Sequence, residues 1–282
     1  MKISIVYFTF SLLFTFSLLQ IVTATPVSSI VENVTKKDSS QQKKRLLNVG
    51  FDYGSNSVYF GHSDSIKYPY ISPSITYKGK YGFWLSTSTY RILNFSKLVD
   101  ETDVSSGWDF DISKRIDASL SYTHSFYNST GTGRLKSVFT NNIASNVGLD
   151  WSWLYSALSV EYNFGNAKDF FISIDNSRTF EFGKIFSSSD ELSFDPIISI
   201  VTGTQDFVSK HYKGDKQIKK GKKIILSAFS IIDYEFKLPL TYRINHFSFE
   251  SAWHYTLPVN RLQGDYSTDQ SYFTLGLYYT FK

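Results

Sequence analysis

Residues 271–281 read Ser-Tyr-Phe-Thr-Leu-Gly-Leu-Tyr-Tyr-Thr-Phe, and they alternate between two kinds of side chain. Successive side chains of a β-strand point to opposite faces of the sheet. One face of this segment therefore carries Phe273, Leu275, Leu277, Tyr279 and Phe281, and the other carries Tyr272, Thr274, Gly276, Tyr278 and Thr280. The pattern predicts a long strand with one strongly apolar face.

The same alternation recurs along the chain from Leu47 onward, in about twelve segments. Most of these segments are about 9 to 15 residues long, whereas strands of soluble proteins are usually about 5 or 6. A tilted strand that crosses a membrane needs about 9–11 residues. The expected strands lie at 48–61, 70–78, 80–91, 106–115, 117–127, 141–150, 154–164, 169–181, 193–203, 223–237, 244–257 and 271–281.

The second face of the expected strands carries Asp, Glu, Asn, Ser and Thr through the middle of each segment. A β-sandwich would need apolar side chains there to pack its two sheets together. Apolar outside and polar inside is the pattern of a transmembrane barrel. We therefore predict an all-β fold, an antiparallel up-and-down transmembrane β-barrel of about 12 strands, with 10–14 possible.

The links between these segments give a second indication of a barrel. Short links follow the second, fourth, sixth and tenth segments, and long links follow the third, fifth, ninth and eleventh. Outer-membrane barrels have short periplasmic turns and long external loops. The links 165–168 and 182–192 break this alternation, and Pro73 predicts a bulge or a later start in the second strand.

Composition excludes several classes of site. The 282 residues include no Cys, which removes disulfides, thiolate metal sites and cysteine nucleophiles. Aromatic residues make up 18% of the chain, and Tyr and Trp favour membrane interfaces. No spacing of His, Asp or Glu predicts a metal site, so we expect no cofactor. Filling of a soluble β core is the alternative role for the aromatic residues.

The N-terminus predicts export. Residues 1–24 combine Lys2 with a long apolar run that ends at Ala24, as in a secretory signal peptide. A retained transmembrane helix is the alternative. Residues 25–46 are polar and basic and predict a disordered periplasmic linker, followed by the barrel at 47–282.

The barrel segment resembles the uncharacterised outer-membrane β-barrel proteins of Bacteroidota-type Gram-negative bacteria. The resembling stretches are Asn48 to Tyr53, Tyr77 to Phe83, and Leu275 to Phe281. The resemblance implies a bacterial outer-membrane location, contact with outer-membrane lipid and lipopolysaccharide, and insertion by the barrel assembly machinery. Many such barrels end on an aromatic residue, whereas Phe281 is penultimate here and Lys282 is last. No activity follows from the resemblance, and we expect no nucleic-acid partner for an exported chain.

Carboxylates on the polar face are the predicted pore-lining residues. Rings of acidic side chains favour cations in a pore, so they predict a porin-like channel for small solutes with modest cation preference. Alternatively they only hydrate a closed lumen in a structural or ligand-binding barrel. The candidates are Asp52, Asp109, Asp111, Asp150, Glu161, Asp175 and Glu250.

A basic segment at 208–223 is the most charged part of the chain, and on this topology it is external. It could contact lipopolysaccharide phosphates, fold onto the lumen carboxylates, or stay a solvated loop. Its basic residues are Lys210, Lys213, Lys216, Lys219, Lys220, Lys222 and Lys223.

Two further readings remain. A lipid-modifying hydrolase would use His246 and Ser248, with Glu250 on the same face, but this triple is expected on the lumen side. A eukaryotic secreted protein would use the Asn-x-Ser/Thr triplets at Asn33, Asn94 and Asn128, which the long amphipathic strands argue against. We expect no enzyme and no catalytic residues, with the hydrolase as the minority reading.

Overall fold

The computed structural model describes residues 45–63, 66–128, 135–212, 229–262 and 265–281, in which 14 strands form one antiparallel sheet. Two short helical segments accompany them, the 3-10 turn η2 (Leu135–Val138) and helix α3 (Asp206–Tyr212). The strands are β1 Leu46–Gly54, β2 Tyr70–Lys78, β3 Phe83–Ile92, β4 Glu101–Asp111, β5 Ile116–Tyr127, β6 Phe139–Asp150, β7 Tyr155–Gly165, β8 Lys168–Ser177, β9 Phe180–Gly183, β10 Asp190–Phe194, β11 Ile197–Gly203, β12 Ser230–Ile244, β13 Phe247–Pro258 and β14 Gln270–Phe281.

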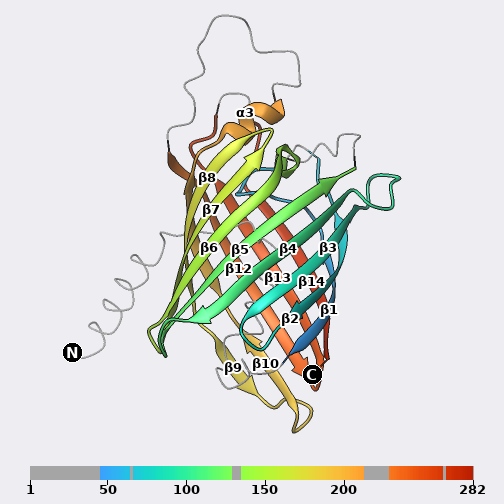
Figure 1. The fold of residues 1–282 in the computed structure, drawn as a ribbon, viewed down its shortest axis with the longest axis vertical. Helices are drawn as coiled ribbons and strands as arrows, with labels where there is room; N and C mark the ends of the chain where they lie inside the picture. The colour runs from blue at the N-terminus through green and yellow to red at the C-terminus, as the bar shows by residue number, and fades with distance from the viewer. Residues whose placement is uncertain (1–44, 64–65, 129–134, 213–228, 263–264, 282) are drawn as a thin grey trace, which may run out of the picture.

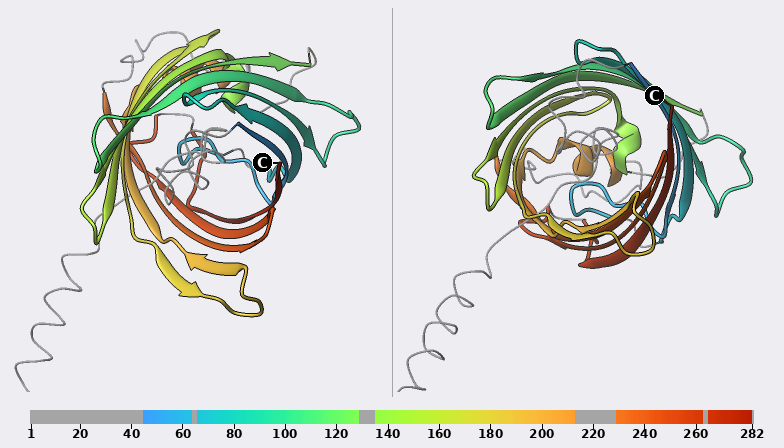
Figure 2. Two further views of the ribbon diagram at one scale, coloured as in Figure 1. Left: turned by 60° about the horizontal axis from the view of Figure 1, so that its bottom comes forward. Right: turned by 90° about the horizontal axis from the view of Figure 1, so that it is seen from below.

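The sheet closes into a barrel, as Figures 1 and 2 show. Strands β1 to β8 follow one another around the wall, β1 pairs with β14, and β14 leads through β13 to β12. Strand β11 pairs with β12 and lies against β8, where the amide of Thr204 donates to the carbonyl of Phe170 at 3.0 Å. Strands β10 and β11 share one position beside β12, so the barrel has 12 strand positions. This confirms the predicted fold class.

Prolines mark two irregular places in the wall. The ninth position is split into β10 and β11 at Asp195–Pro196, opposite Pro239 of β12, whose carbonyl accepts from the Asp195 amide. Pro73 stays inside β2 and pairs with Phe51, but the β2–β3 register is interrupted beside it. Because proline donates no ladder hydrogen bond, both interruptions follow from the residue type.

Several predicted strand bounds were wrong. The first strand ends at Gly54 rather than 61, and the fourth runs over Glu101–Asp111 rather than 106–115. Strand β12 continues to Ile244, so the expected link 238–243 lies within it and the turn is formed by residues 245–246. The alternation of apolar and polar residues is weak in 238–244, around Pro239. There was therefore little indication in the sequence that the strand continues there.

The two ends of the barrel differ in their connections. We call the end where β1 begins and β14 finishes the terminal end, and the opposite end the loop end (Figure 1). Residues 93–100, together with the described parts of the links from β11 to β12 (204–212 and 229) and from β13 to β14 (259–262 and 265–269), lie at the loop end. The long link expected after the eighth strand is a hairpin, β9–β10, which extends from the wall at the terminal end (Figure 2). At the loop end, residues 166–167 alone join β7 to β8.

The two faces of the wall differ as the alternation predicts. Outward side chains are apolar and exposed, as for Leu85, Leu120, Phe249, Leu275 and Phe281. Inward side chains are largely polar and buried, as for Ser74, Ser86, Ser105, Ser173 and Thr241. The barrel interior is therefore a polar lumen rather than an apolar core.

Inward glycines make room for inward aromatic rings. A methyl group added at Gly107 would collide with the ring of Trp84, and one at Gly148 with that of Tyr155. Gly54 is related to Tyr70 in the same way. These rings lie flat on the wall because the neighbouring strand has no side chain at that position.

The apolar core lies at the loop end instead of in the wall. Apolar side chains from residues 55–63, η2, α3 and the wall form one cluster there, and Figure 2 shows the first three of these segments inside the ring of strands. Its buried members are Phe60, Phe139, Ala167, Phe171, Val201, Phe207, Val208 and Ile232.

Candidate functional site in the barrel lumen

Five of the seven predicted pore-lining carboxylates lie on the inward face of the wall: Asp52, Asp109, Glu161, Asp175 and Glu250. Asp111 and Asp150 are exposed at the terminal end, where β4 and β6 finish. One carboxylate oxygen of Asp150 accepts from the amide of Ser152 at 2.6 Å and so stabilises the turn. We therefore correct the placement of Asp111 and Asp150 from the lumen to the rim.

The lumen holds further carboxylates that the sequence analysis missed. Glu101 and Asp103 fell in an expected link, because the start of β4 was placed too late. Asp233 and Glu235 lay in an expected strand, and the alternation there could have identified them. Asp117 and Asp169 lie close to the ends of β5 and β8.

Three lysines neutralise part of this acidic lining. Lys78 Nζ lies 2.6 Å from Asp109 Oδ2, and Lys237 Nζ lies 3.6 Å from Glu250 Oε1. Lys136, from η2, contacts both Glu101 and Asp103. Buried carboxylates are strongly destabilising unless they are paired or hydrogen-bonded, so these contacts allow the charges to stay inside.

Other lumen carboxylates accept hydrogen bonds from neutral groups. Tyr155 donates its hydroxyl to Asp117 at 2.8 Å, and Tyr278 donates to Asp52. Asn142 donates its amide to Glu161 Oε2 at 2.9 Å. These hydrogen bonds orient the carboxylates. Because the donors are neutral, they do not cancel a carboxylate's negative charge.

His254 forms the centre of a buried network on the β12–β14 wall. Its Nδ1 lies 2.8 Å from Glu235 Oε1, and its Nε2 lies 3.1 Å from the Thr274 hydroxyl. Its ring stacks on Tyr272 at 4.5 Å between centroids, and the Tyr272 hydroxyl donates to Glu235 at 3.3 Å. Each polar group of this network has a partner, so it acts as a rigid part of the wall.

The loop end of the lumen is occupied by residues 55–63, which we call the plug segment. Its tip is a tight turn in which Tyr59 and His62 exchange two backbone hydrogen bonds, at 2.9 and 3.0 Å. Phe60 and Gly61 at the tip both have positive φ, 47° and 72°. The Phe60 ring stacks on Phe171 of the wall at 4.0 Å.

A polar latch holds the plug segment in place. His62 Nδ1 lies 2.8 Å from Asp265 Oδ2, and both side chains are fully buried. The hydroxyl of Ser267 accepts from the Ser63 amide at 3.1 Å and donates to the Ser63 carbonyl at 3.2 Å. Burial acts to raise the pKa of Asp265, but the hydrogen bond and charge of His62 outweigh it and hold that pKa below its usual range.

Only one lysine of the predicted external basic segment lies within the described residues. Lys210 is exposed on α3, near the loop end. Lys213, Lys216, Lys219, Lys220, Lys222 and Lys223 lie outside the described residues. The predicted signal peptide, 1–24, and residues 25–44 of the predicted linker lie outside them too, whereas Leu46, expected in the linker, begins β1.

The possible hydrolase pair is not assembled. His246 lies in the exposed turn between β12 and β13, and its Nδ1 is 2.8 Å from the carbonyl oxygen of Thr280. Ser248 faces inward beside Arg243, its register partner on β12. The bond from Nδ1 leaves Nε2 as the nitrogen that could act on a hydroxyl, but within the described residues no hydrogen bond joins His246 to Ser248.

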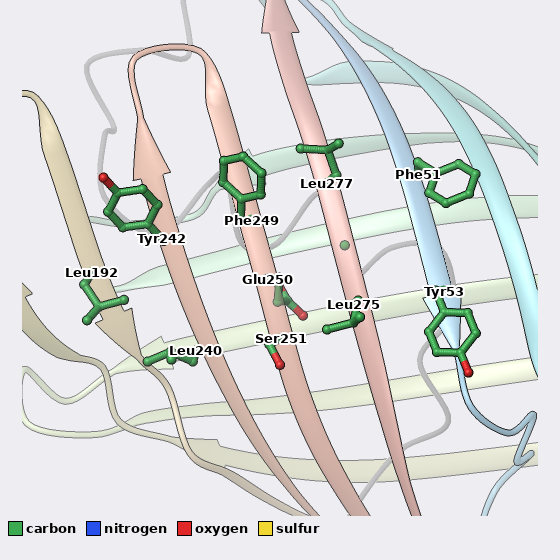
Figure 3. A pocket seen from close by; sticks show the side chains of 11 residues that line it. Phe51, Tyr53, Leu192, Leu240, Tyr242, Phe249, Glu250, Ser251, Leu275 and Leu277 are labelled. Atoms are coloured by element: carbon green, nitrogen blue, oxygen red, sulfur yellow. The ribbon is translucent and has the colours of Figure 1, made fainter.

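A groove of about 480 Å³ lies on the outer wall beside β10. Figure 3 shows apolar side chains of β1, β10, β12, β13 and β14 around it, among them Phe51, Leu192, Phe249 and Leu277. Glu250, which also borders the groove, belongs to the inward face. The groove continues the apolar outer surface and contains no cluster of polar groups suited to chemistry.

Two kinds of feature are absent from the described residues. They contain no group of three or more His, Asp or Glu side chains arranged to hold a metal ion. None of the helices in the described part of the chain is long and apolar enough to cross a membrane.

No family model matches the sequence, and no curated protein matches it. Among solved structures, the chain is similar to the KdgM porin, with a TM-score of 0.49 and 10% identity over 83% of this chain and 99% of that one. It is similar to the NanC porin, with a TM-score of 0.47 and 10% identity over 83% and 98% of the two chains. It is also similar to LpxR from Salmonella typhimurium, with a TM-score of 0.45 and 9% identity over 82% and 99%.

Proposed function

We propose that this chain is a porin-like channel of a bacterial outer membrane, which passes small solutes and prefers cations. The observation that carries the proposal is the lumen, in which inward carboxylates outnumber inward lysines and arginines among the residues that the structure describes. Asp52, Asp117 and Glu161 are hydrogen-bonded to neutral groups, so their charge is available to a passing ion. Acidic linings of this kind attract cations and repel anions.

The apolar outer face supports the membrane part of the proposal. Large apolar side chains are exposed around the barrel, and a soluble protein rarely leaves so continuous an apolar surface in water. In such a membrane the termini are periplasmic and the loop end is external. Outer-membrane lipid and lipopolysaccharide would then contact the wall and the basic segment after α3, and the barrel assembly machinery would insert the chain. We also propose that the relatives of this chain are the outer-membrane β-barrel proteins of Bacteroidota-type bacteria.

The plug segment makes the proposed channel a gated one. It fills the loop end with an apolar tip and is held by the buried His62–Asp265 pair. Solute passage would therefore depend on displacement of residues 55–63, and the closed form would carry little current.

Planar-bilayer conductance of the refolded mature chain tests the proposal. We expect stable current steps, rare in the intact protein, with a reversal potential on the cation side across a salt gradient. Absence of current from a folded barrel, even after the plug segment is removed, would overturn the channel. Anion preference would overturn the role of the carboxylates.

A closed barrel with a structural or ligand-binding role is the second candidate, and the plug segment is the observation that favours it. It predicts no current with or without the plug. A lipid hydrolase is the minority alternative; it predicts release of fatty acid that stops in Ser248→Ala, and the position of His246 gives it no support.

A further inference from the structure

The boundary between β8 and β11 differs from the other boundaries of the wall. The other neighbouring strands are joined by ladders of paired residues, as β7 is to β8 and β11 is to β12. Both β8 and β11 lie wholly within the described residues, and no such ladder joins them there. The barrel is therefore closed at this place by contact between two strands, and not by a continuous ladder.

Side-chain hydroxyls take the place of ladder groups along this boundary. The Phe170 amide donates to the Thr204 hydroxyl at 3.0 Å, and the Thr202 hydroxyl donates to the Ile172 carbonyl at 3.1 Å. In a regular antiparallel ladder both partners of each bond are backbone groups. Because the ladder is missing, fewer backbone hydrogen bonds must break here for two strands to separate than elsewhere in the wall.

A single carboxylate fastens the loop end of the boundary. Asp169 of β8 is buried and accepts from the Thr204 hydroxyl at 2.6 Å. It also accepts from the amides of Asp206 and Phe207, the first residues of α3, each at 2.7 Å. Figure 1 shows α3 at this end of the barrel, near the end of β8. One side chain thus ties β8 to the residues that follow β11.

The wall is apolar on both of its faces beside this boundary. On the outside, Phe170 and Ile174 are exposed. On the inside, Phe171 and Val201 are buried in the apolar cluster of the loop end, whereas the inward face is largely polar elsewhere. The Phe171 ring lies against Gly203 of β11, where an added methyl group would collide with it. An alkyl chain that crosses the wall here stays in contact with apolar groups.

The plug segment covers the inner side of the boundary. Phe60 stacks on Phe171 with 4.0 Å between the ring centroids, and Phe207 of α3 packs against the same ring at 5.9 Å. These are dispersion contacts between apolar groups, and an alkyl chain offers contacts of the same kind. A polar group buried in this cluster without a hydrogen-bond partner would be destabilising, so the cluster suits an alkyl chain alone.

We propose that the wall opens between β8 and β11, and that the alkyl chain of a single-chain amphiphile enters there from the bilayer onto the apolar cluster. The inference goes beyond the proposed channel. Its route is lateral and takes an apolar chain, whereas the route of the channel is axial and takes small cations. Asp169 and the plug segment hold the lateral route closed when no chain is bound.

A photoreactive fatty acid tests the route without any measurement of current. The probe carries a diazirine at the end of its alkyl chain, and vesicles that contain both the probe and the folded barrel are irradiated. Peptide mass spectrometry then identifies the labelled segments. We expect label on the plug segment and on α3, which lie inside the ring of strands, in addition to label on the outer wall.

A reversible lock across the boundary connects this label with the opening. The chain has no Cys, so introduced cysteines are its only thiols. The backbone bond from Thr204 to Phe170 sets a register in which Ile174 lies opposite Ile200. Oxidation of Ile174→Cys with Ile200→Cys should lower the interior label several-fold, and reduction should restore it. The matched control is Ile174→Cys with Leu158→Cys, which locks the β7–β8 ladder and should leave the label unchanged.

A second pair of variants tests the fastening without a disulfide. Asp169→Asn has one acceptor oxygen in place of two, so it cannot hold both Thr204 and α3, and we expect more interior label. Asp190→Asn is the matched control, because Asp190 accepts from the three backbone amides of residues 185–187 in the turn between β9 and β10. Its interior label should equal that of the intact protein.

Four outcomes would overturn the lateral route: no label on the plug segment or α3, label that the β8–β11 lock leaves unchanged, an equal fall with the β7–β8 lock, or equal label in Asp169→Asn and Asp190→Asn. If either disulfide fails to form, the last comparison decides. Conductance keeps the result separate from the channel. Interior label without current would leave a lateral route in a barrel that passes no ions, and current without interior label would leave an axial channel with an intact wall.

Discussion

At the scale of single residues, the His62–Asp265 pair links the position of the plug segment to pH. The folded-state pKa of Asp265 is lower than that of an ordinary aspartate. Its ionised form therefore stabilises the fold above about pH 4, and this contribution is lost as the pH falls through the lower, folded-state pKa. We expect Asp265→Asn to unfold more easily than the intact protein at pH 7 and to differ less from it at pH 3.

Urea unfolding at both pH values measures this difference. Breaking a buried pair by removing one partner typically costs about 3–5 kcal/mol, so the effect at pH 7 should be large. Asp150→Asn is the matched control, because Asp150 is exposed at the opposite end. A difference for Asp265→Asn that stays constant between pH 7 and pH 3 would contradict the latch.

Gly61 is the second decisive residue of the plug segment. Its φ of 72° costs an alanine about 1–2 kcal/mol, and its added methyl group would also collide with Asp233. Gly61→Ala should therefore loosen the tip and increase the open fraction in bilayer recordings. Gly183→Ala controls for backbone strain, because φ is 69° there and an added methyl group would meet nothing within 4 Å. Equal current from both variants would show that the tip does not close the lumen.

At the scale of elements, the plug segment can be removed without breaking a strand. Gly54 and Tyr70 are register partners, so an Asn-Gly turn in place of residues 55–69 should join β1 to β2 as a tight hairpin. We expect a several-fold larger conductance together with a lower unfolding temperature, because Tyr59 and Phe60 leave the apolar cluster. Shortening residues 184–189 between β9 and β10, which lie at the terminal end, should leave conductance unchanged. A plug-deleted barrel that folds and stays silent would favour the closed, ligand-binding alternative.

The strands were predictable from the sequence, whereas the plug was not. Each strand of the wall has one face toward apolar surroundings and the other toward a polar interior. Its side chains therefore alternate with a period of two, which can be recognised in 271–281 and in most other segments. The alternation continues into residues 55–61, so Tyr59 and Phe60 were expected in the first strand. The burial of Phe60 and His62 depends instead on Phe171, Phe207 and Asp265, which are distant in sequence. The same reason explains why Asp109 was predicted while Glu101 and Asp103 were missed. Their strand begins five residues before its alternation becomes regular.

At the scale of the whole molecule, a closed wall of strands surrounds a lumen. The inward face of this wall carries many carboxylates and a few lysines. Lys78 and Lys237 each compensate one carboxylate, and Lys136 compensates two. The carboxylates held by Tyr and Asn side chains have no lysine contact within the described residues. In the proposed channel, carboxylates of this kind would favour cations over anions.

Cation preference should therefore depend on the carboxylates without lysine contacts and not on all acidic residues equally. In a barrel freed of its plug, replacing Asp52 and Asp117 by Asn and Glu161 by Gln keeps the hydrogen-bond acceptors and removes the charge. We expect the cation-to-anion permeability ratio from the reversal potential to fall toward one. Replacing Asp111 and Asp150 by Asn at the rim should change it little, because exposed charges are screened over about 8–10 Å at moderate salt. Recordings at low salt enlarge the contrast between the two variants. If the permeability ratio changes with the rim substitutions, or with neither set, ions are selected outside the lumen. The lumen carboxylates would then only stabilise the wall.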